Sequence, residues 1–275
     1  MADRNEIAQL ASQLWADTLL PQPLAPGKAW LGIYRVLLWY ESAAEGPTLP
    51  HIVSTHHFRG SAGGARKANR TWIRRAQQVN ALLAKEFGCR PMRVPGRVDG
   101  LMRMPRFRGV QRNNPLGIAF TELVAHVLRK FGAQHLEYRT HVASADLFPC
   151  VTLKSKNRHP RADIAVLRDG APVAVITTAW SVRYDRFAKV IDESAAYRSA
   201  ATQCGLRLPC FFVTNEYSPA RLAKVMSSGV LECVVHVCPR IVTEVCDLDG
   251  RLGKLKDLPY LIQQTQTWGS PHGDS

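Results

Sequence analysis

Residues 162–186 constrain the fold of this chain more than any other stretch, because their pattern predicts two antiparallel strands and the start of a helix. Asp163 opens a first apolar run, and the pair Asp169-Gly170 after it is typical of a tight hairpin turn. A second apolar run follows the turn, and Thr177 and Ala179 fall on one face of it because side chains alternate along a strand. The stretch therefore predicts a β-hairpin with a carboxylate near the start of its first strand.

From residue 115 onward, the pattern predicts the element order α-β-β-β-α-β-α-β, which is typical of an α/β (α+β) fold with a mixed central sheet flanked by helices. Gly132 is expected to end the first of these helices as its C-cap. Ser218 is expected to cap a later helix whose first turn begins with Pro219. Besides the hairpin, the expected elements are helices over 116–131, 184–202, 218 onward and 258–264, and strands over 136–142, 209–214 and 231–237.

The N-terminal part of the chain is expected to be mostly helical or irregular. Apolar residues at helical spacing indicate a helix over 6–20, which a proline-rich segment ends. The apolar run 30–40 fits either a strand or a buried helix. A Gly-rich loop leads into a basic helix over 65–87, whereas 91–115 is rich in Arg, Pro and Gly and is expected to be irregular.

Positive charge is concentrated in one part of the chain. The formal net charge is +14, and residues 59–112 hold fourteen Lys and Arg against only two acids, Glu86 and Asp99. Twelve of the fourteen are arginines, interleaved with Gly, Asn, Gln, Trp72 and Phe107. Arginine binds phosphates and guanine edges through two parallel hydrogen bonds, so the pattern favours a nucleic-acid surface over an idle basic face. An acidic membrane surface is disfavoured because no sustained apolar helix face accompanies the charge.

The cysteines and the apolar runs bear on the compartment. The seven cysteines form no Cys-x-x-Cys pair and most lie in apolar runs, so buried reduced thiols are favoured over a zinc site. The chain begins with a polar segment, and no apolar run approaches the roughly 18–20 residues that a membrane span needs. We therefore expect a cytoplasmic protein.

Three acids stand where they could hold a divalent metal ion, which prefers hard oxygen ligands such as carboxylates, water and phosphate. Asp163 opens the first hairpin strand, although a lone Asp there fits a turn or a cap equally well. Glu122 is the only acid of its helix and lies at the margin of the apolar face. Glu193 lies on the helix that leaves the second hairpin strand directly, so it could reach the strand end. The competing interpretation of Glu193 is a salt bridge with Arg186, Lys189 or Arg198.

Residues 177–186, TTAWSVRYDR, resemble a recurring acid/Ser/Thr-x-Lys-Trp-Ser-x-Arg-x-Asp-Arg run of the PD-(D/E)xK nuclease superfamily, most narrowly of type II restriction endonucleases. The resemblance covers roughly 115–237, and the Trp-Ser-x-Arg-x-Asp-Arg part is its specific portion. It implies a restriction-endonuclease-like core with a Mg²⁺ site. The residues to which it assigns metal binding and catalysis are Asp163, Glu193 and Glu122, with Thr177 and the position of Ala179 completing the catalytic set.

Two positions depart from the family's run. Thr177 replaces the usual acid, and the family offers a precedent, since some restriction enzymes carry Ser or Thr there and bring the carboxylate from the following helix, as Glu193 would. Ala179 stands in place of the lysine, which positions or polarises the attacking water and stabilises charge in the transition state. A methyl group can do neither, a loss that typically costs on the order of 10²–10³ in rate. We favour an engineered Lys-to-Ala change over a naturally inactive relative, because the neighbouring signature and the other acids are kept.

The sequence therefore predicts a metal-dependent, sequence-specific endonuclease that cuts double-stranded DNA, in a form impaired at Ala179. The alternative is a double-stranded-DNA-binding protein without a hydrolytic role on the same scaffold. RNA binding or processing is disfavoured because no aromatic-rich single-strand platform stands out, and a protein whose acids are all structural remains a further alternative. The resemblance also implies a homodimer on a palindromic site, a bacterial cytoplasmic location and a cognate DNA methyltransferase in the same system.

These expectations divide the chain into three regions: a DNA-binding and dimerisation region over 1–114, a nuclease core over 115–267, and a disordered tail over 268–275. The cations expected to contact DNA are Arg59, Arg66, Lys67, Arg70, Arg74, Arg75, Arg103, Arg106, Arg108, Arg112, Arg183 and Arg186.

Overall fold

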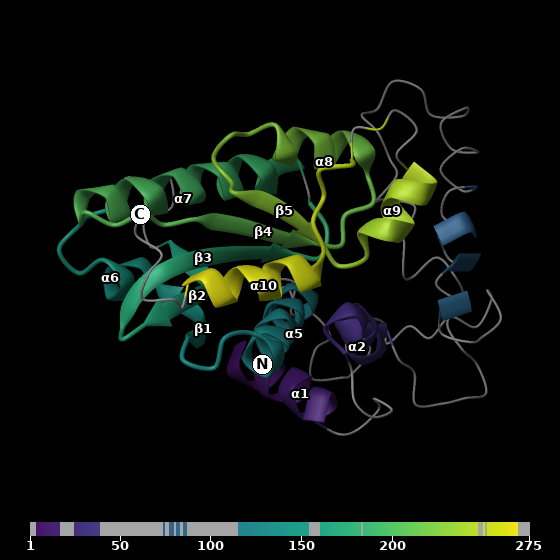
Figure 1. Ribbon diagram of the computed structural model, residues 1–275, viewed down its shortest axis with the longest axis horizontal. Helices are drawn as coiled ribbons and strands as arrows, with labels where there is room; N and C mark the ends of the chain where they lie inside the picture. The colour runs from purple at the N-terminus through teal and green to yellow at the C-terminus, as the bar shows by residue number, and fades with distance from the viewer. Residues whose placement is uncertain are drawn as a thin grey trace.

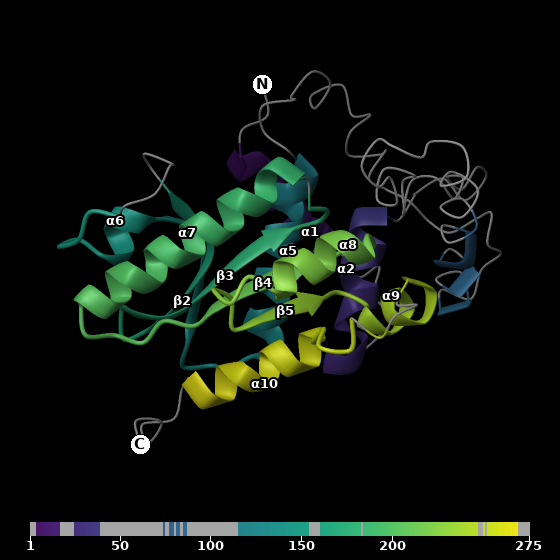
Figure 2. The ribbon, with the colours of Figure 1, turned by 90° about the horizontal axis from the view of Figure 1, so that it is seen from above.

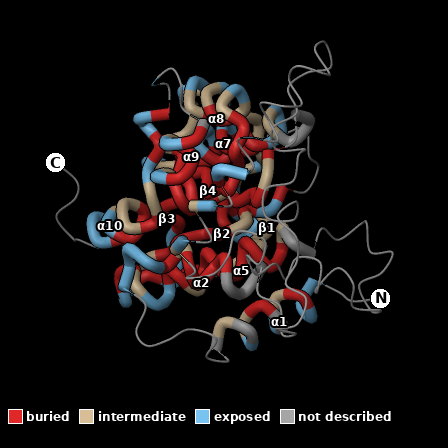
Figure 3. Tube along the Cα trace, turned by 90° about the vertical axis from the view of Figure 1, so that its right-hand side faces the viewer, coloured by how far each residue is buried: buried red, intermediate tan, exposed pale blue. Residues whose placement is uncertain are grey.

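The computed structural model describes residues 4–16, 25–38, 115–153, 160–182, 184–246, 250 and 252–268, together with positions 74, 77–79, 81–82 and 85–86. These residues form a central sheet between layers of helices (Figure 1). Buried residues gather between the layers, and exposed residues lie on the outer sides of the helices (Figure 3).

The sheet is mixed, with five strands in the order β1 (Glu137–Ala143), β2 (Arg161–Arg168), β3 (Ala171–Ala179), β4 (Cys210–Thr214) and β5 (Cys233–His236). The first three strands pair antiparallel, whereas β3, β4 and β5 pair parallel. Parallel neighbours need crossover connections, and a helix supplies each one. The strand order and directions confirm the predicted mixed α/β fold.

Helices cover both faces of the sheet. The bounds are α1 (Arg4–Ala16), η1 (Pro26–Lys28), α2 (Ala29–Leu38), α5 (Pro115–Phe131), α6 (Ser144–Leu147), α7 (Tyr184–Gln203), α8 (Pro219–Met226), α9 (Pro239–Cys246) and α10 (Leu258–Trp268). The crossover helices α7 and α8 lie over one face, while α5 and α10 lie on the other side (Figures 1 and 2). α1 and α2 pack against α5. The sequence pattern did not predict the short helices α6 and α9, which leave the sheet order unchanged. None of the described helices has the length and apolar character that crossing a membrane requires.

β2 and β3 form the predicted hairpin. Asp169 and Gly170 have φ angles of 52° and 81°, the two positive values that a type I′ turn requires. Ile164 lies opposite Ile176 in the ladder, and the register shifts at a bulge nearer the turn. The Asp-Gly pair thus specifies the hairpin because aspartate and glycine tolerate the left-handed conformation better than other residues.

Two predicted caps have a different physical basis from the one expected. α5 ends before Gly132, but this glycine does not have a positive φ. A Cβ there would lie 2.4 Å from the Tyr138 hydroxyl and 2.6 Å from the Leu128 carbonyl, so glycine is needed for close packing and not for a left-handed cap. Ser218 precedes α8 as expected, but its side chain makes no capping hydrogen bond to the described residues. Its N–H instead donates to Glu216 Oε1 at 2.8 Å.

The apolar run near residue 30, which fits either a strand or a helix, is the helix α2. The expected helix over 6–20 is α1, described as far as Ala16. Ile7 of α1 and Tyr34 of α2 belong to the same buried cluster as the apolar face of α5. The division at residue 114 stays a prediction, as does the tail, since α10 ends at Trp268 and residues 269–275 lie outside the described part.

The two edges of the sheet are each engaged by a neighbouring segment. Beside β1, Arg129 donates from Nε and Nη2 to the Tyr138 carbonyl at 3.2 and 2.9 Å. Beside β5, the His236 N–H donates to the Lys256 carbonyl at 2.8 Å, and the Lys256 N–H donates to the Val234 carbonyl at 3.0 Å.

Candidate active site

The Asp163 carboxylate lies where β2 and β3 separate. Beyond the pair Ile164–Ile176, the N–H of Thr178 donates to Asp163 Oδ2 at 2.8 Å instead of to a backbone carbonyl of β2. The side chain of Asp163 is half-buried. This hydrogen bond fixes one carboxylate oxygen at the end of the hairpin ladder.

The side chains of β3 show which face of the sheet belongs to the site. Thr178 points toward α5, because its Oγ1 lies 2.6 Å from Oγ1 of Thr121. Neighbouring side chains of a strand alternate, so Thr177 and Ala179 lie on the opposite face, which α7 covers. Ala179, at the position expected for lysine, is buried, and Thr177 is half-buried.

Glu193 projects from α7 and is 7% exposed. Lys189, one turn earlier, places Nζ 3.6 Å from Glu193 Oε1, so one of the ion pairs considered for Glu193 is present. Lys189 is itself exposed, and an exposed pair of this kind contributes at most about 1 kcal/mol. Arg198, another of the considered partners, donates to the Val230 carbonyl at 2.8 Å. Glu193 is therefore a buried acid with an ion-pair partner at the surface.

Tyr197 lies one turn after Glu193 on α7. Its side chain is 1% exposed, and its hydroxyl has no hydrogen-bond partner among the described residues. Burial, then the negative charges of Glu193 and Asp163, raise the pKa of Tyr197 well above its usual range. The charges of both carboxylates thus act on one buried hydroxyl, although the acids are thirty residues apart in the chain.

Glu122 has a different environment. Arg129 Nη1 donates to Glu122 Oε1 at 2.7 Å, and His126 Nε2 lies 3.7 Å from the same oxygen. His126 Nε2 also lies 2.8 Å from Ser12 Oγ on α1, and burial lowers the pKa of His126. In the described part of the chain, no three His, Cys, Asp or Glu side chains are grouped so that they could hold a metal ion. Glu122 is therefore paired with Arg129, and the described residues include no three-ligand group to which it could belong.

Sequence reasoning missed a buried acid at the ends of the parallel strands. Glu216 is completely buried after β4 and accepts hydrogen bonds from the N–H groups of Val182 and Ser218, each at 2.8 Å. Arg221 Nη1 lies 3.2 Å from its Oε2. Burial raises the pKa of Glu216, although these donors act in the opposite direction. The available signal was the polar run Thr214-Asn215-Glu216 directly after the apolar residues 210–213.

The same junction holds other buried polar groups. The Tyr34 hydroxyl donates to Asn215 Oδ1 and lies 2.8 Å from the Tyr217 hydroxyl. His236 Nε2 lies 3.0 Å from the Glu216 carbonyl, and burial lowers the pKa of His236 to about 3. The ring of Trp180, next to Ala179, lies 5.6 Å from that of Tyr34. The junction thus joins α2 to the end of β3.

Most of the cations expected to contact DNA lie outside the described residues. Arg74 is described and exposed, and the main chain of Arg186 lies in the first turn of α7. The other ten, which are Arg59, Arg66, Lys67, Arg70, Arg75, Arg103, Arg106, Arg108, Arg112 and Arg183, lie outside the described residues, as does the side chain of Arg186. Their contacts with DNA stay predictions.

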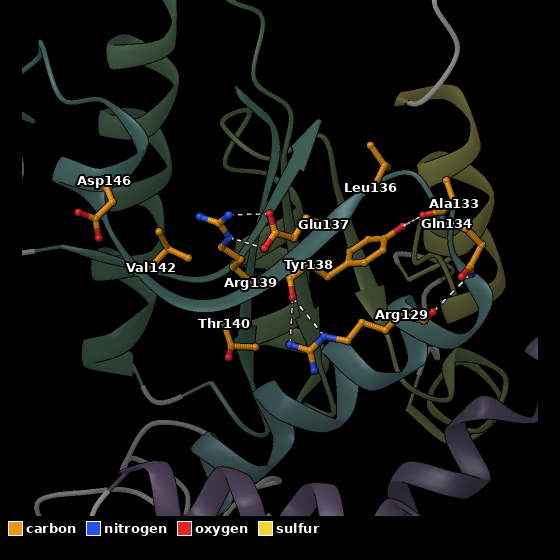
Figure 4. Close-up of a pocket in the computed structure, with 10 residues that line it drawn as sticks. All are labelled: Arg129, Ala133, Gln134, Leu136, Glu137, Tyr138, Arg139, Thr140, Val142 and Asp146. Carbon is orange, nitrogen blue, oxygen red and sulfur yellow. Dashed lines mark hydrogen bonds and ion pairs between the residues drawn. The ribbon is translucent and has the colours of Figure 1, made fainter. Parts of the chain in front are cut away.

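A cavity of about 700 Å³ lies beside β1, away from these acids (Figure 4). Its two arginines point inward from α5 and β1, but both are engaged: Arg129 by the Tyr138 carbonyl, and Arg139 by Glu137 at 2.5 and 2.7 Å. The cavity therefore offers hydrogen-bonded guanidinium groups and is not the site suggested by the hairpin.

No family model and no curated protein matches this sequence. Among solved structures, the restriction endonuclease PspGI in complex with substrate DNA is similar with 11% identity and a TM-score of 0.45, over 98% of this chain and 93% of that chain. Metal-depleted Ecl18kI in complex with uncleaved DNA is similar with 10% identity and a TM-score of 0.35, over 100% of this chain and 87% of that chain. The mixed α/β fold of the chain is shown by its own strand order and directions.

Proposed function

We propose that this protein is a type II restriction endonuclease that hydrolyses phosphodiester bonds of double-stranded DNA with a divalent metal ion, here in a form impaired at Ala179. The observation that carries the proposal is the Asp163 carboxylate, which the Thr178 N–H holds at 2.8 Å where the hairpin strands separate, with the buried Glu193 on α7, the helix that packs on β3. Thr177 and Ala179, which resemble the acid and lysine positions of the family, lie on the same face of the sheet.

Mg²⁺ fits this donor set. It takes one or two protein carboxylates and keeps several waters, so two acids beside an unpartnered buried hydroxyl suffice without a third protein ligand. Asp163 and Glu193 would hold the ion, and the N–H of Thr178 would keep the Asp163 carboxylate oriented. When bound, the ion neutralises developing charge and lowers the pKa of a water molecule. Ala179 contributes no charge where a lysine would stabilise the transition state.

DNA binding would fall to the Arg-rich residues 59–112. Arginine contacts to phosphates would make the affinity fall steeply with salt, because bound counterions are released from the DNA. A two-fold homodimer would place one catalytic centre on each strand of a palindromic site. A bacterial cytoplasmic location and a methyltransferase that protects the same site complete the proposal.

One specific observation favours a second candidate function. Ala179 taken as it stands, together with the engagement of Glu122 by Arg129, suits a double-stranded-DNA-binding protein that does not cut.

Restoring the lysine at position 179 distinguishes the endonuclease from the DNA-binding protein that does not cut. The Ala179→Lys variant, incubated with Mg²⁺ and with plasmid and bacteriophage DNA, is expected to give discrete fragments at a rate about 10²–10³ above that of the unsubstituted protein. The matched control is the double variant Asp163→Ala/Ala179→Lys, which is expected to give none. Retained duplex binding without cleavage by Ala179→Lys, across several DNAs and metals, would instead support the binding protein.

A further inference from the structure

The hydroxyl of Tyr197 is a buried polar group whose hydrogen-bonding capacity the described part of the fold does not use. Its hydroxyl finds no hydrogen-bond partner in the described part of the chain, although the side chain is 1% exposed. A buried hydroxyl without a partner is unfavourable, so a group of this kind calls for a ligand or a water that completes it. The aromatic ring alone would fill the same space.

The position of Tyr197 identifies what that ligand would be. The ring packs in the apolar cluster beneath α7, which includes Ala165 and Val175 of the hairpin. Glu193 lies one turn earlier on the same helix, and the charges of Glu193 and Asp163 both act on the hydroxyl. The hydroxyl is hydrogen-bonded to neither acid in the described part of the chain, so its hydrogen-bonding capacity is still open to a ligand.

We propose that Tyr197 is a positioning residue of the metal site, whose hydroxyl accepts a hydrogen bond from a water molecule bound to the ion held by Asp163 and Glu193. The inference rests on the proposed function. A water on a divalent ion is a strong donor, and a phenolic oxygen accepts as well as donates. Groups that hold the ligands of a metal in this way typically contribute 10- to 100-fold to its affinity.

The test is Mg²⁺ binding by the full chain, measured by isothermal titration calorimetry. Tyr197→Phe removes only the hydroxyl and is expected to weaken Mg²⁺ binding about tenfold. The matched control is Ser194→Ala, which removes a second buried hydroxyl without a described partner from the same helix and is expected to leave the affinity unchanged. Thermal melting of both variants shows that they fold, and Tyr197→Phe is expected to melt no lower than the unsubstituted protein.

The outcomes separate this inference from the proposed function. Mg²⁺ binding that Asp163→Ala abolishes but Tyr197→Phe leaves within twofold overturns the role of Tyr197 and keeps the metal site. If the unsubstituted protein and Asp163→Ala bind Mg²⁺ equally or not at all, the metal site itself is overturned, and the role of Tyr197 with it. An equal loss of affinity in Ser194→Ala and Tyr197→Phe also overturns the inference, because general loosening of α7 would then explain both.

Discussion

Two buried polar groups of this protein differ in how completely the fold satisfies them. Glu216, at the ends of the parallel strands, accepts hydrogen bonds on both oxygens from main-chain N–H groups and lies beside Arg221. Tyr197, under α7, is buried nearly as completely, but its hydroxyl has no partner among the described residues. Burial alone therefore does not show whether a polar group is satisfied by the fold, and the role proposed for Tyr197 depends on its open hydroxyl together with its place one turn after Glu193.

The difference in hydrogen bonding also separates acids that hold the fold together from acids that we propose to bind the metal ion. Glu216 ties the N–H of Val182, three residues after Ala179, to the start of α8, and so holds the end of β3 in place. Asp163 and Glu193 are the acids to which we assign chemistry, and the charges of both raise the pKa of Tyr197. Substitutions should accordingly affect stability in the first group and metal binding in the second.

The largest effect on stability is expected from Glu216→Ala. It leaves the N–H groups of Val182 and Ser218 buried without their acceptor, at a cost of about 3 kcal/mol in the free energy of unfolding. Urea denaturation measures this change. A loss below about 1 kcal/mol would show that Glu216 is not the structural member of the comparison.

The next effect is a pH dependence that arises from His236. Burial lowers its pKa in the folded protein to about 3, so the native state keeps it neutral while the unfolded chain binds a proton below pH 6.5. Its contribution to stability is therefore present above pH 6.5 and falls by about 1.4 kcal/mol per unit as the pH falls from 6.5 toward 3. Urea midpoints of the unsubstituted protein and of His236→Gln, compared from pH 7 to pH 4.5, should diverge in slope; parallel slopes would contradict the assignment.

The contribution of Glu216 to stability changes with pH in the opposite direction over part of the range from pH 7 to pH 4.5. Burial raises its pKa, so its contribution to stability is present below the ordinary carboxyl pKa of 4.5 and is lost as the pH rises through the higher folded value. The comparison with His236→Gln cancels this contribution because both proteins keep Glu216.

The smallest effect on stability is expected from Glu193→Gln. Its pairing with Lys189 is exposed on the lysine side, so the free energy of unfolding should change by no more than about 1 kcal/mol. Mg²⁺ affinity, in contrast, should fall strongly because a charged ligand is lost. Lys189→Ala is the control that breaks the ion pair and keeps the acid. Unchanged Mg²⁺ binding in Glu193→Gln would show that Glu193 is a structural acid like Glu216 and not a metal ligand.

The features that the sequence predicts well are those that depend on residues close together in the chain. The pair Asp169-Gly170 specified the hairpin because turn chemistry depends on adjacent residues, and apolar periodicity located α7 and β4 nearly to the residue. Glu193 could be put forward as a candidate because its helix leaves the hairpin directly, and its burial on α7 agrees with that placement, while its role as a metal ligand stays a prediction.

What the sequence predicts poorly depends on partners far along the chain. Glu216 binds the N–H of a residue 34 positions earlier, and main-chain donors leave no trace in a sequence. Gly132 was predicted at the right position for the wrong reason, because its neighbour Tyr138 approaches only in the folded state. For Glu122, the two-turn spacing to Arg129 was visible, but the sequence alone could not decide between an ion pair and a metal.

The engaged edges of the sheet restrict how copies of this protein can assemble. Arg129 occupies the Tyr138 carbonyl beside β1, and the segment at Lys256 pairs with β5. A second copy that docked strand against strand would have to displace these contacts before it could lengthen the sheet. The proposed two-fold assembly is therefore expected to use helices and loops rather than the edges of the sheet, so that neither copy would have to give up these contacts.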